Sequence, residues 1–346
     1  MNVNEISIGN RKIGEDHAPF VICEIGINHN GDFQKAKQMI RDACESGAEC
    51  VKFQSHVIED EMIENEIVPV NANESIWTMM KRCSFSEDQE NYLKKYVEEL
   101  NMIYLCTPFS RESVNRLERM NVLAYKIGSG ECNNIPLLNL IASKNKPVLL
   151  STGMNDIESI RNSVNIFEKH EIPYALLHTT SLYPTSYEKV RLGAISDLKN
   201  NFPTAVLGLS DHSFGNYTCF ASIPLGCSIL EKHFTSDKNW PGSDIPVSID
   251  PSQLKDLIMG SNAIHKALGG KKDFLLAERE TSNFAFACVV SITDIKSGDH
   301  FSYDNLWIKR PGTGKLSSQQ LEKIINKKAA QDIKKDTQLE WNMIED

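Results

Sequence analysis

The chain lacks the features that mark membrane, secreted and nucleic-acid-binding proteins. None of its 346 residues falls in an apolar run approaching the roughly 18 to 20 residues that a membrane-spanning helix needs. There is no block of Lys or Arg, and the net charge is −9, so nucleic acid is a poor partner for its surface. Residues 1–8 contain neither a basic nor an apolar stretch of the kind that begins a signal peptide. We therefore expect a cytoplasmic protein.

The nine cysteines are scattered singly, and no two have the Cys-x-x-Cys spacing. That spacing is typical of zinc ribbons and thiol redox sites, so the sequence indicates neither class. An odd number of isolated cysteines within apolar segments instead indicates buried free thiols in a reducing compartment.

What the chain does contain is a regular alternation of short apolar runs and amphipathic segments, such as 32–46 and 156–170. The runs are 20–25, 50–54, 103–107, 124–128, 148–152, 174–178, 205–209 and 228–233. Eight such units within about 250 residues predict an α/β fold, a (β/α)8 TIM barrel. An open doubly wound sheet is the alternative, but 26–31 lacks the Gly-rich fingerprint that such folds carry.

The composition divides the chain into a predicted barrel domain over 1–269 and a small C-terminal domain over 284–346. The polar segment 270–283 has no strong periodicity, and we interpret it as a linker. The C-terminal domain is expected to contain short strands, turns and a short helix near 317–328. Within the barrel, the acidic segment 58–85 interrupts the alternation, and it is either a loop over an active site or a solvated surface.

Two histidines, His212 and His233, end successive strand-like runs. In a parallel barrel both side chains then lie at the carboxyl edge of neighbouring strands, where such folds place their chemistry. Two imidazoles at that edge indicate a divalent metal site, open to other ligands. The alternative is a pair of buried histidines that are hydrogen-bonded to the backbone.

Other polar residues also occur in or after the predicted strands. Lys52 and Lys126 lie within apolar strands, and burying an ammonium group is costly unless an anion pairs with it. We favour ligand binding over a structural ion pair for both. Glu24 is a candidate general base or orienter of metal-bound water, or else a salt-bridge partner that braces the barrel. Strand-end hydroxyls either bind a ligand or cap the next helix; they are Thr107, Ser129 and Ser151.

Taken in order, these segments resemble a known family. The motifs are Glu24-Ile-Gly-Ile-Asn-His-Asn-Gly31, Lys52-Phe-Gln54, Thr107-Pro-Phe109, Lys126-Ile-Gly-Ser-Gly-Glu131, Ser151-Thr-Gly-Met154, Tyr183-Pro-Thr185, Ser210-Asp-His212 and Glu231-Lys-His-Phe-Thr235. They resemble the sialic acid synthase family, which includes the bacterial N-acetylneuraminate synthases. The tail, with Lys309-Arg-Pro-Gly312, is similar to the antifreeze-like (SAF, β-clip) domain of that family.

The resemblance implies a metal-dependent condensation of phosphoenolpyruvate with N-acetylmannosamine, giving N-acetylneuraminic acid and phosphate. It implies Mn²⁺ as the metal, with Mg²⁺ or Co²⁺ as alternatives. Glu24 would be catalytic, and His212 and His233 would be catalytic metal ligands. The remaining implied roles are phosphoenolpyruvate binding by Lys52, Gln54, Thr107, Lys126, Ser129 and Ser151, and sugar binding by Glu131, Tyr183 and Asp244.

The resemblance also implies a domain-swapped homodimer in which Arg310 reaches the sugar in the partner subunit's barrel. The alternative is that Lys309-Arg-Pro-Gly312 is only a charged turn.

Three positions depart from the neuraminate synthase pattern: Phe53, Ser181 and Trp240. They keep open a 2,4-diacetamido-trideoxyhexose acceptor, as used by legionaminate or pseudaminate synthases, although the tail motifs favour neuraminate. Two more distant readings are a metal-dependent retro-aldolase and a non-catalytic sugar-binding or ice-binding protein.

Overall fold

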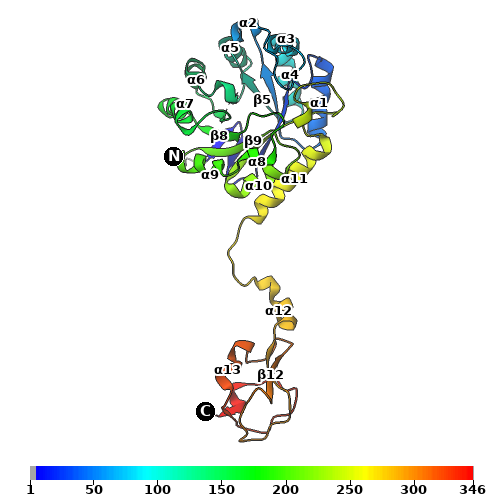
Figure 1. The fold of residues 1–346 in the computed structure, drawn as a ribbon, viewed down its shortest axis with the longest axis vertical. Helices are drawn as coiled ribbons and strands as arrows, with labels where there is room; N and C mark the ends of the chain where they lie inside the picture. The colour runs from blue at the N-terminus through cyan, green and yellow to red at the C-terminus, as the bar shows by residue number, and fades with distance from the viewer. Residues whose placement is uncertain (1–4, 346) are drawn as a thin grey trace. The chain divides into compact units, whose positions relative to one another are not determined.

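The computed structural model describes residues 5–345 and divides into two compact units, Met1–Gly269 and Gly270–Asp346 (Figure 1). The first unit contains eight parallel strands in the order β5-β4-β3-β10-β9-β8-β7-β6, with β5 and β6 side by side at the closure. The strands are β3 (Phe20–Gly26), β4 (Cys50–Ser55), β5 (Ile103–Pro108), β6 (Tyr125–Ile127), β7 (Val148–Ser151), β8 (Tyr174–Thr179), β9 (Val206–Asp211) and β10 (Cys227–His233). All eight predicted strands and the (β/α)8 barrel are confirmed.

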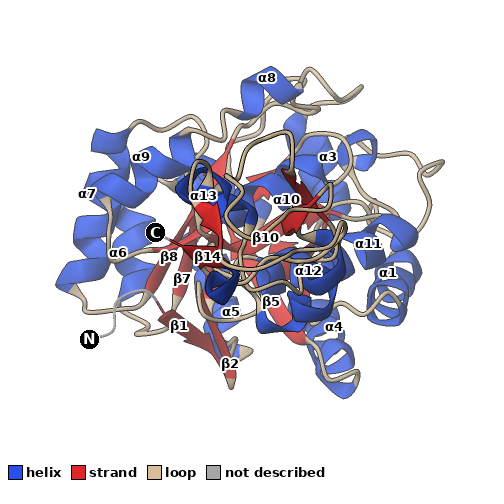
Figure 2. Cartoon of the chain, turned by 90° about the horizontal axis from the view of Figure 1, so that it is seen from below, coloured by secondary structure: helices blue, strands red, loops and turns tan. Residues whose placement is uncertain are grey.

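Helices surround the strands in Figure 2. They are α1 (Phe33–Glu45), α4 (Glu87–Glu99), α5 (Arg111–Arg119), α6 (Ile135–Ala142), α7 (Ile157–Lys169), α9 (Ala194–Asn201), α10 (Tyr217–Ser222) and α11 (Pro251–Ala267), with the single turn α8 (Tyr187–Val190) on the way to α9. The predicted segments 32–46 and 156–170 are α1 and α7. The side chains of Asp32 and Asp156 accept backbone N–H groups of the first turns, which is why each helix begins there.

The barrel interior has an apolar layer at the amino ends of the strands. It includes Phe20, Ile22 and Leu105. An N-terminal hairpin that the sequence reasoning missed, β1 (Glu5–Ile8) with β2 (Arg11–Gly14), adds Ile6, Ile8 and Ile13 to this layer. The hairpin therefore closes the amino end of the barrel.

Further along the strands the interior becomes polar. Successive side chains alternate between the two faces of a strand, so the residue two places on points the same way. On several strands an apolar interior residue is followed in this way by a polar one, as in Ile22 to Glu24, Leu105 to Thr107 and Leu149 to Ser151. The polar layer thus lies at the carboxyl ends.

The acidic segment 58–85 contains α2 (Ile58–Glu61) and α3 (Ile76–Cys83). Ile58, Met79 and Cys83 are buried with Ile27 in a small apolar cluster of their own. The side-chain amide of Asn71 also donates to the Ser243 carbonyl, at 3.2 Å, beyond β10. The segment is therefore packed onto the carboxyl end of the barrel rather than being only a solvated acidic surface.

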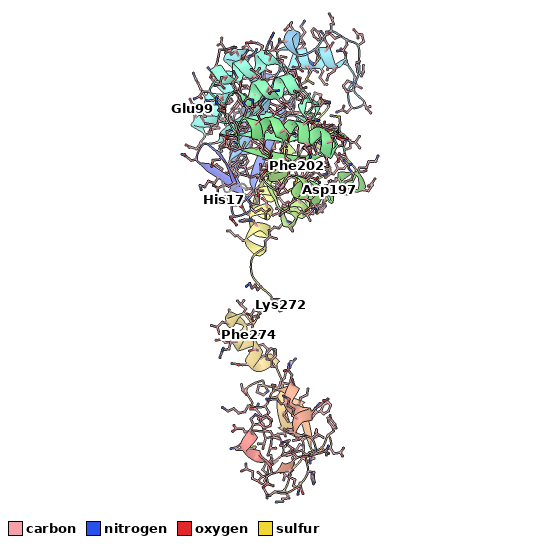
Figure 3. The ribbon with its side chains drawn as sticks, turned by 90° about the vertical axis from the view of Figure 1, so that its left-hand side faces the viewer. His17, Glu99, Asp197, Phe202, Lys272 and Phe274 are labelled. Carbon is pink, nitrogen blue, oxygen red and sulfur yellow. The ribbon has the colours of Figure 1, made fainter. Side chains whose placement is uncertain are left out.

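The second unit contains short elements around a small core that includes Val289, Phe301, Leu306 and Leu339. Its elements are α12 (Arg279–Ala285), β11 (Cys288–Ser291), β12 (Leu306–Lys309), α13 (Leu321–Ile324), β13 (Lys328–Ala329) and β14 (Ile344–Glu345), with β11–β12 and β13–β14 antiparallel. The predicted short helix corresponds to α13 and the 3-10 turn Ser318–Gln320 before it. The predicted linker 270–283 is partly helical, because α12 begins at Arg279. Figure 3 labels Lys272 and Phe274 in the part before α12.

All nine cysteines are free, and Cys44 alone is partly exposed. Across residues 5–345, none of the helices has the length and apolar character that crossing a bilayer requires.

Candidate active site

A cavity of about 400 Å³ lies at the carboxyl ends of the barrel strands. Ten of the predicted site residues line it: Glu24, Lys52, Gln54, Thr107, Lys126, Ser129, Ser151, Tyr183, His212 and His233. Pro69 and Asn71 of the segment 58–85 line it as well. This position favours the active-site-loop interpretation of that segment.

On one side of the cavity Lys52 and Glu24 form a buried ion pair, with 2.8 Å between Nζ and Oε2. Lys52 Nζ also donates to Thr107 Oγ1 at 2.9 Å. Burial raises the pKa of Glu24 to about 7, although Lys52 opposes the shift. A carboxyl group with that pKa can exchange a proton near neutral pH, as a general base must.

The second lysine, Lys126, donates to Ser151 Oγ at 2.6 Å and lies 3.7 Å from Glu231 Oε1. Burial lowers the pKa of Lys126 to about 8, against the pull of the Glu231 carboxylate. Burial alone would raise the pKa of Glu231, but Lys126 and Lys52 outweigh it and lower that pKa to about 2. Glu231 is therefore the firmly ionised partner of this pair. Both lysines have protein partners, and both face the cavity.

The two histidines lie side by side, with ring centres 5.4 Å apart. His212 Nδ1 lies 2.8 Å from the Thr180 carbonyl oxygen, which only accepts, so the proton sits on Nδ1 and Nε2 keeps its lone pair. Nδ1 of His233 is buried without a hydrogen-bond partner, 3.6 Å from Asp244 Oδ2. Burial lowers the pKa of both rings, that of His233 to about 4. Both are neutral at pH 7, as metal ligation requires.

Two neutral imidazoles, one of them with an unpartnered buried nitrogen, fit a divalent ion. Within residues 5–345 no cluster of three or more His, Cys, Asp or Glu side chains is arranged to hold a metal. An ion held by His212 and His233 would keep several positions for water or substrate, as catalytic sites do. Because His212 contacts a backbone carbonyl, it also fits the alternative of a buried histidine that is hydrogen-bonded to the backbone. His233 does not fit that alternative, because its Nδ1 has no hydrogen-bond partner.

The predicted sugar-binding residues are less uniformly placed. The Tyr183 ring lies over His212, with centres 4.1 Å apart, and Asp244 lies beside His233. Glu131 does not line the cavity; it ends a 3-10 turn and accepts a hydrogen bond from Asn134 Nδ2 at 2.5 Å. Arg310 is an exposed residue of the second unit, directly after β12. Its assignment to a partner subunit's site stays a prediction.

Two protein-family models match this chain, one over most of the barrel unit and one over the C-terminal unit. Residues 39–273 match the NeuB family, and residues 286–345 match the SAF domain. The chain belongs to the NeuB family.

Its NeuB relatives include an uncharacterised protein of Methanocaldococcus jannaschii, 37% identical over 98% of both chains. An N,N'-diacetyllegionaminic acid synthase of Campylobacter jejuni is 36% identical over 91% of this chain and 97% of its own length. A crystal structure of the N-acetylneuraminic acid synthetase of Leptospira borgpetersenii superposes with a TM-score of 0.74, at 33% identity over 80% of this chain and 94% of that one. These findings confirm the family and the SAF domain.

Sequence reasoning left several lining residues of this NeuB barrel unassigned. They are Phe109, Met154, Thr179, Ser210 and Glu231, together with Asn71. Glu231 had a usable signal: it precedes His233 by two places on one strand, so it shares the interior face. By the same alternation, Asp211 and Lys232 point the other way and form a buried ion pair of 2.9 Å behind the histidines.

Two of the three positions that depart from the neuraminate synthase pattern lie away from the cavity. Phe53 packs in the layer between strands and helices, where its ring stacks on Tyr104. Trp240 packs against the same layer, with Lys35 Nζ 4.6 Å from the ring centre. Ser181 does line the cavity. Phe53 does not line the cavity, because its side chain alternates outward.

Proposed function

We propose that this protein condenses phosphoenolpyruvate with the open-chain aldehyde of N-acetylmannosamine, giving N-acetylneuraminic acid and phosphate. The observation that carries the proposal is a single cavity in which two lysine–glutamate pairs lie beside two neutral histidines. Family membership supports a synthase of this kind.

The cavity offers an anionic ligand two ammonium groups but no net positive charge. Two ammonium groups and two carboxylates cancel, so a phosphate and a carboxylate need further positive charge on entry. A divalent ion at the histidines would supply that charge. Phosphoenolpyruvate would then lie between the Lys52 side, with Gln54 and Thr107, and the Lys126 side, with Ser129 and Ser151.

In the proposed reaction, C3 of phosphoenolpyruvate attacks the aldehyde carbon, and the aldehyde oxygen takes up a proton to become a hydroxyl group. Water adds to the electron-poor C2, and phosphate leaves C2 with the bridging oxygen. Glu24 accepts the proton of that water. A bound divalent ion would supply Lewis-acid polarisation of the aldehyde.

A second acceptor sugar is also supported by the comparisons. Relatives at 36% and 33% identity, from Campylobacter jejuni and Legionella pneumophila, are named N,N'-diacetyllegionaminic acid synthases. They favour a 2,4-diacetamido-trideoxyhexose as the second candidate. Against it, Phe53 and Trp240 do not face the cavity, so only Ser181 of the three departures can contact a sugar.

The deciding experiment measures phosphate release from phosphoenolpyruvate with Mn²⁺ and a panel of acceptors. We expect release with N-acetylmannosamine and its loss after chelation. Release only with diacetamido sugars would establish the second candidate. No release with any hexosamine would exclude the synthase assignment.

A further inference from the structure

A chain of three hydrogen bonds leads from the segment 58–85 to Glu24. Glu61 Oε2 lies 2.8 Å from His56 Nδ1, and His56 Nε2 lies 3.1 Å from Gln54 Oε1. Gln54 Nε2 then donates to Glu24 Oε1 at 3.0 Å. The proposed reaction assigns no role to His56 or Glu61.

Donor and acceptor chemistry fixes the direction of this chain. An ionised Glu24 only accepts, so it must face the NH₂ group of the Gln54 amide. The amide carbonyl then faces His56, which must donate to it from Nε2. The Glu61 carboxylate also only accepts, so Nδ1 donates there. All three contacts are satisfied together only when the His56 ring carries both protons.

We propose that His56 and Glu61 are positioning residues that orient the Gln54 amide so that its NH₂ group holds the catalytic carboxylate of Glu24. This inference rests on the proposed function. If the His56 ring carried one proton fewer, the side-chain amide of Gln54 would rotate by about 180°. Its carbonyl would then face Glu24 and oppose ionisation of that carboxyl group.

The surroundings hold the pair in place. The His56 ring is 4% exposed and stacks on Phe109, a cavity-lining residue, at 4.7 Å between ring centres and 12° between planes. On α2, Asp60 next to Glu61 accepts the Glu112 backbone N–H at 2.7 Å and a bond from Arg111 at 3.0 Å. These contacts anchor α2 to α5 and fix where Glu61 points.

Other charged groups near the ring are already engaged. Glu90 pairs with Arg116 at 2.7 Å and accepts the Ser55 hydroxyl, while His29 Nδ1 accepts the Gly31 backbone N–H. Glu131, which feels the Glu61 charge, accepts from Asn134. The Glu61 carboxylate is thus the group that pairs with His56. The segment 58–85 would then have two roles. It lines the cavity, and Glu61 of its first helix, α2, helps to orient the Glu24 carboxyl group.

The first test is Glu61→Gln in the full-length protein, with Glu59→Gln on the exposed side of the same helix as control. We expect kcat to fall about tenfold or more, as for loss of a hydrogen bond to a charged group. The KM for phosphoenolpyruvate should stay within about threefold, because both lysines remain. Glu59→Gln should match the wild type. Equal kcat values in the two variants would overturn the proposal.

A double-mutant cycle separates positioning from general stability. If Glu61 acts through the Gln54 amide, Glu61→Gln should cause no further loss of kcat in a Gln54→Ala background. Losses that multiply would show that Glu61 acts by another route, and the proposal would fail.

A third readout does not need turnover. In the ¹⁵N-histidine-labelled wild type, Nδ1 and Nε2 of His56 should both show hydrogen-bonded protons, and Glu61→Gln should remove one; His56→Gln assigns the signal. A singly protonated wild-type ring would refute the chain. If the wild type releases no phosphate with any acceptor, the proposed function fails while this measurement still tests the pair.

Discussion

At the scale of single residues, the cavity shows how a barrel can hold buried charge before a substrate arrives. Each lysine is too deeply buried to be tolerated alone, and a glutamate offsets each one. The two pairs are unequal: Glu231 stays ionised, whereas burial raises the pKa of Glu24 to about 7. The proton-accepting group and the permanent anion are therefore different residues.

The affinity for phosphoenolpyruvate should depend on Lys126. Burial lowers the pKa of Lys126 to about 8, so in the free protein it loses its charge as pH rises through that value. An anion binds the protonated form, so the Kd should rise by up to about tenfold per pH unit above about pH 8. Titration calorimetry across this range measures the effect. Lys126→Arg should remove the pH dependence; a flat wild-type profile up to pH 10 would contradict the prediction.

The histidine pair gives a second prediction at this scale. His233→Ala and His212→Ala should each abolish Mn²⁺ binding and metal-dependent turnover while the barrel remains folded, since the apolar core does not include them. Calorimetry with Mn²⁺ alone measures binding, and circular dichroism checks the fold. Retained Mn²⁺ affinity in both variants would show that the ion, if any, binds elsewhere.

At the scale of elements, the N-terminal hairpin contributes to stability and lies far from the chemistry. Ile13 of β2 is fully buried in the amino-end layer, so Ile13→Ala should lower the free energy of unfolding by about 2–5 kcal/mol. Urea denaturation measures this loss, with the exposed neighbour Lys12→Ala as control. The two KM values should not change. A loss below about 0.5 kcal/mol would mean that the hairpin does not close the barrel.

The elements also show what a sequence can reveal. Strands were predictable because buried parallel strands are short apolar runs followed by helical periodicity. The hairpin was not, because β1 and β2 follow one another without a helix between them and so stand outside the strand–helix alternation. The direction of side chains on the strands was also missed. Strand alternation places Glu231 in the cavity and Phe53 outside it, whereas a motif match does not distinguish inward-facing from outward-facing residues.

At the scale of the whole molecule, each unit exposes large apolar side chains. On the barrel unit Val70 and Met154 are exposed, and on the second unit Phe284, Phe286 and Trp307 are. In the predicted homodimer a second subunit would cover side chains of this kind, and Arg310 would complete the partner subunit's site.

Subunit complementation tests that assembly. Arg310→Ala should raise the acceptor KM about tenfold or more with little effect on the KM for phosphoenolpyruvate. Refolding it with an equal amount of His233→Ala should restore about a quarter of wild-type activity at acceptor concentrations below the wild-type KM, because half of the dimers would contain one intact site. No recovery in the mixture, with dimers present by light scattering, would place Arg310 in its own chain's site or in none.

The division of the barrel interior into an apolar layer and a polar layer has a practical consequence for protein engineering. Residues such as Ile22 and Leu105 belong to the apolar core, and residues two places on, such as Glu24 and Thr107, line the cavity. Mutant libraries confined to the polar layer and its loops can therefore change what the cavity binds without removing the apolar side chains that stabilise the barrel.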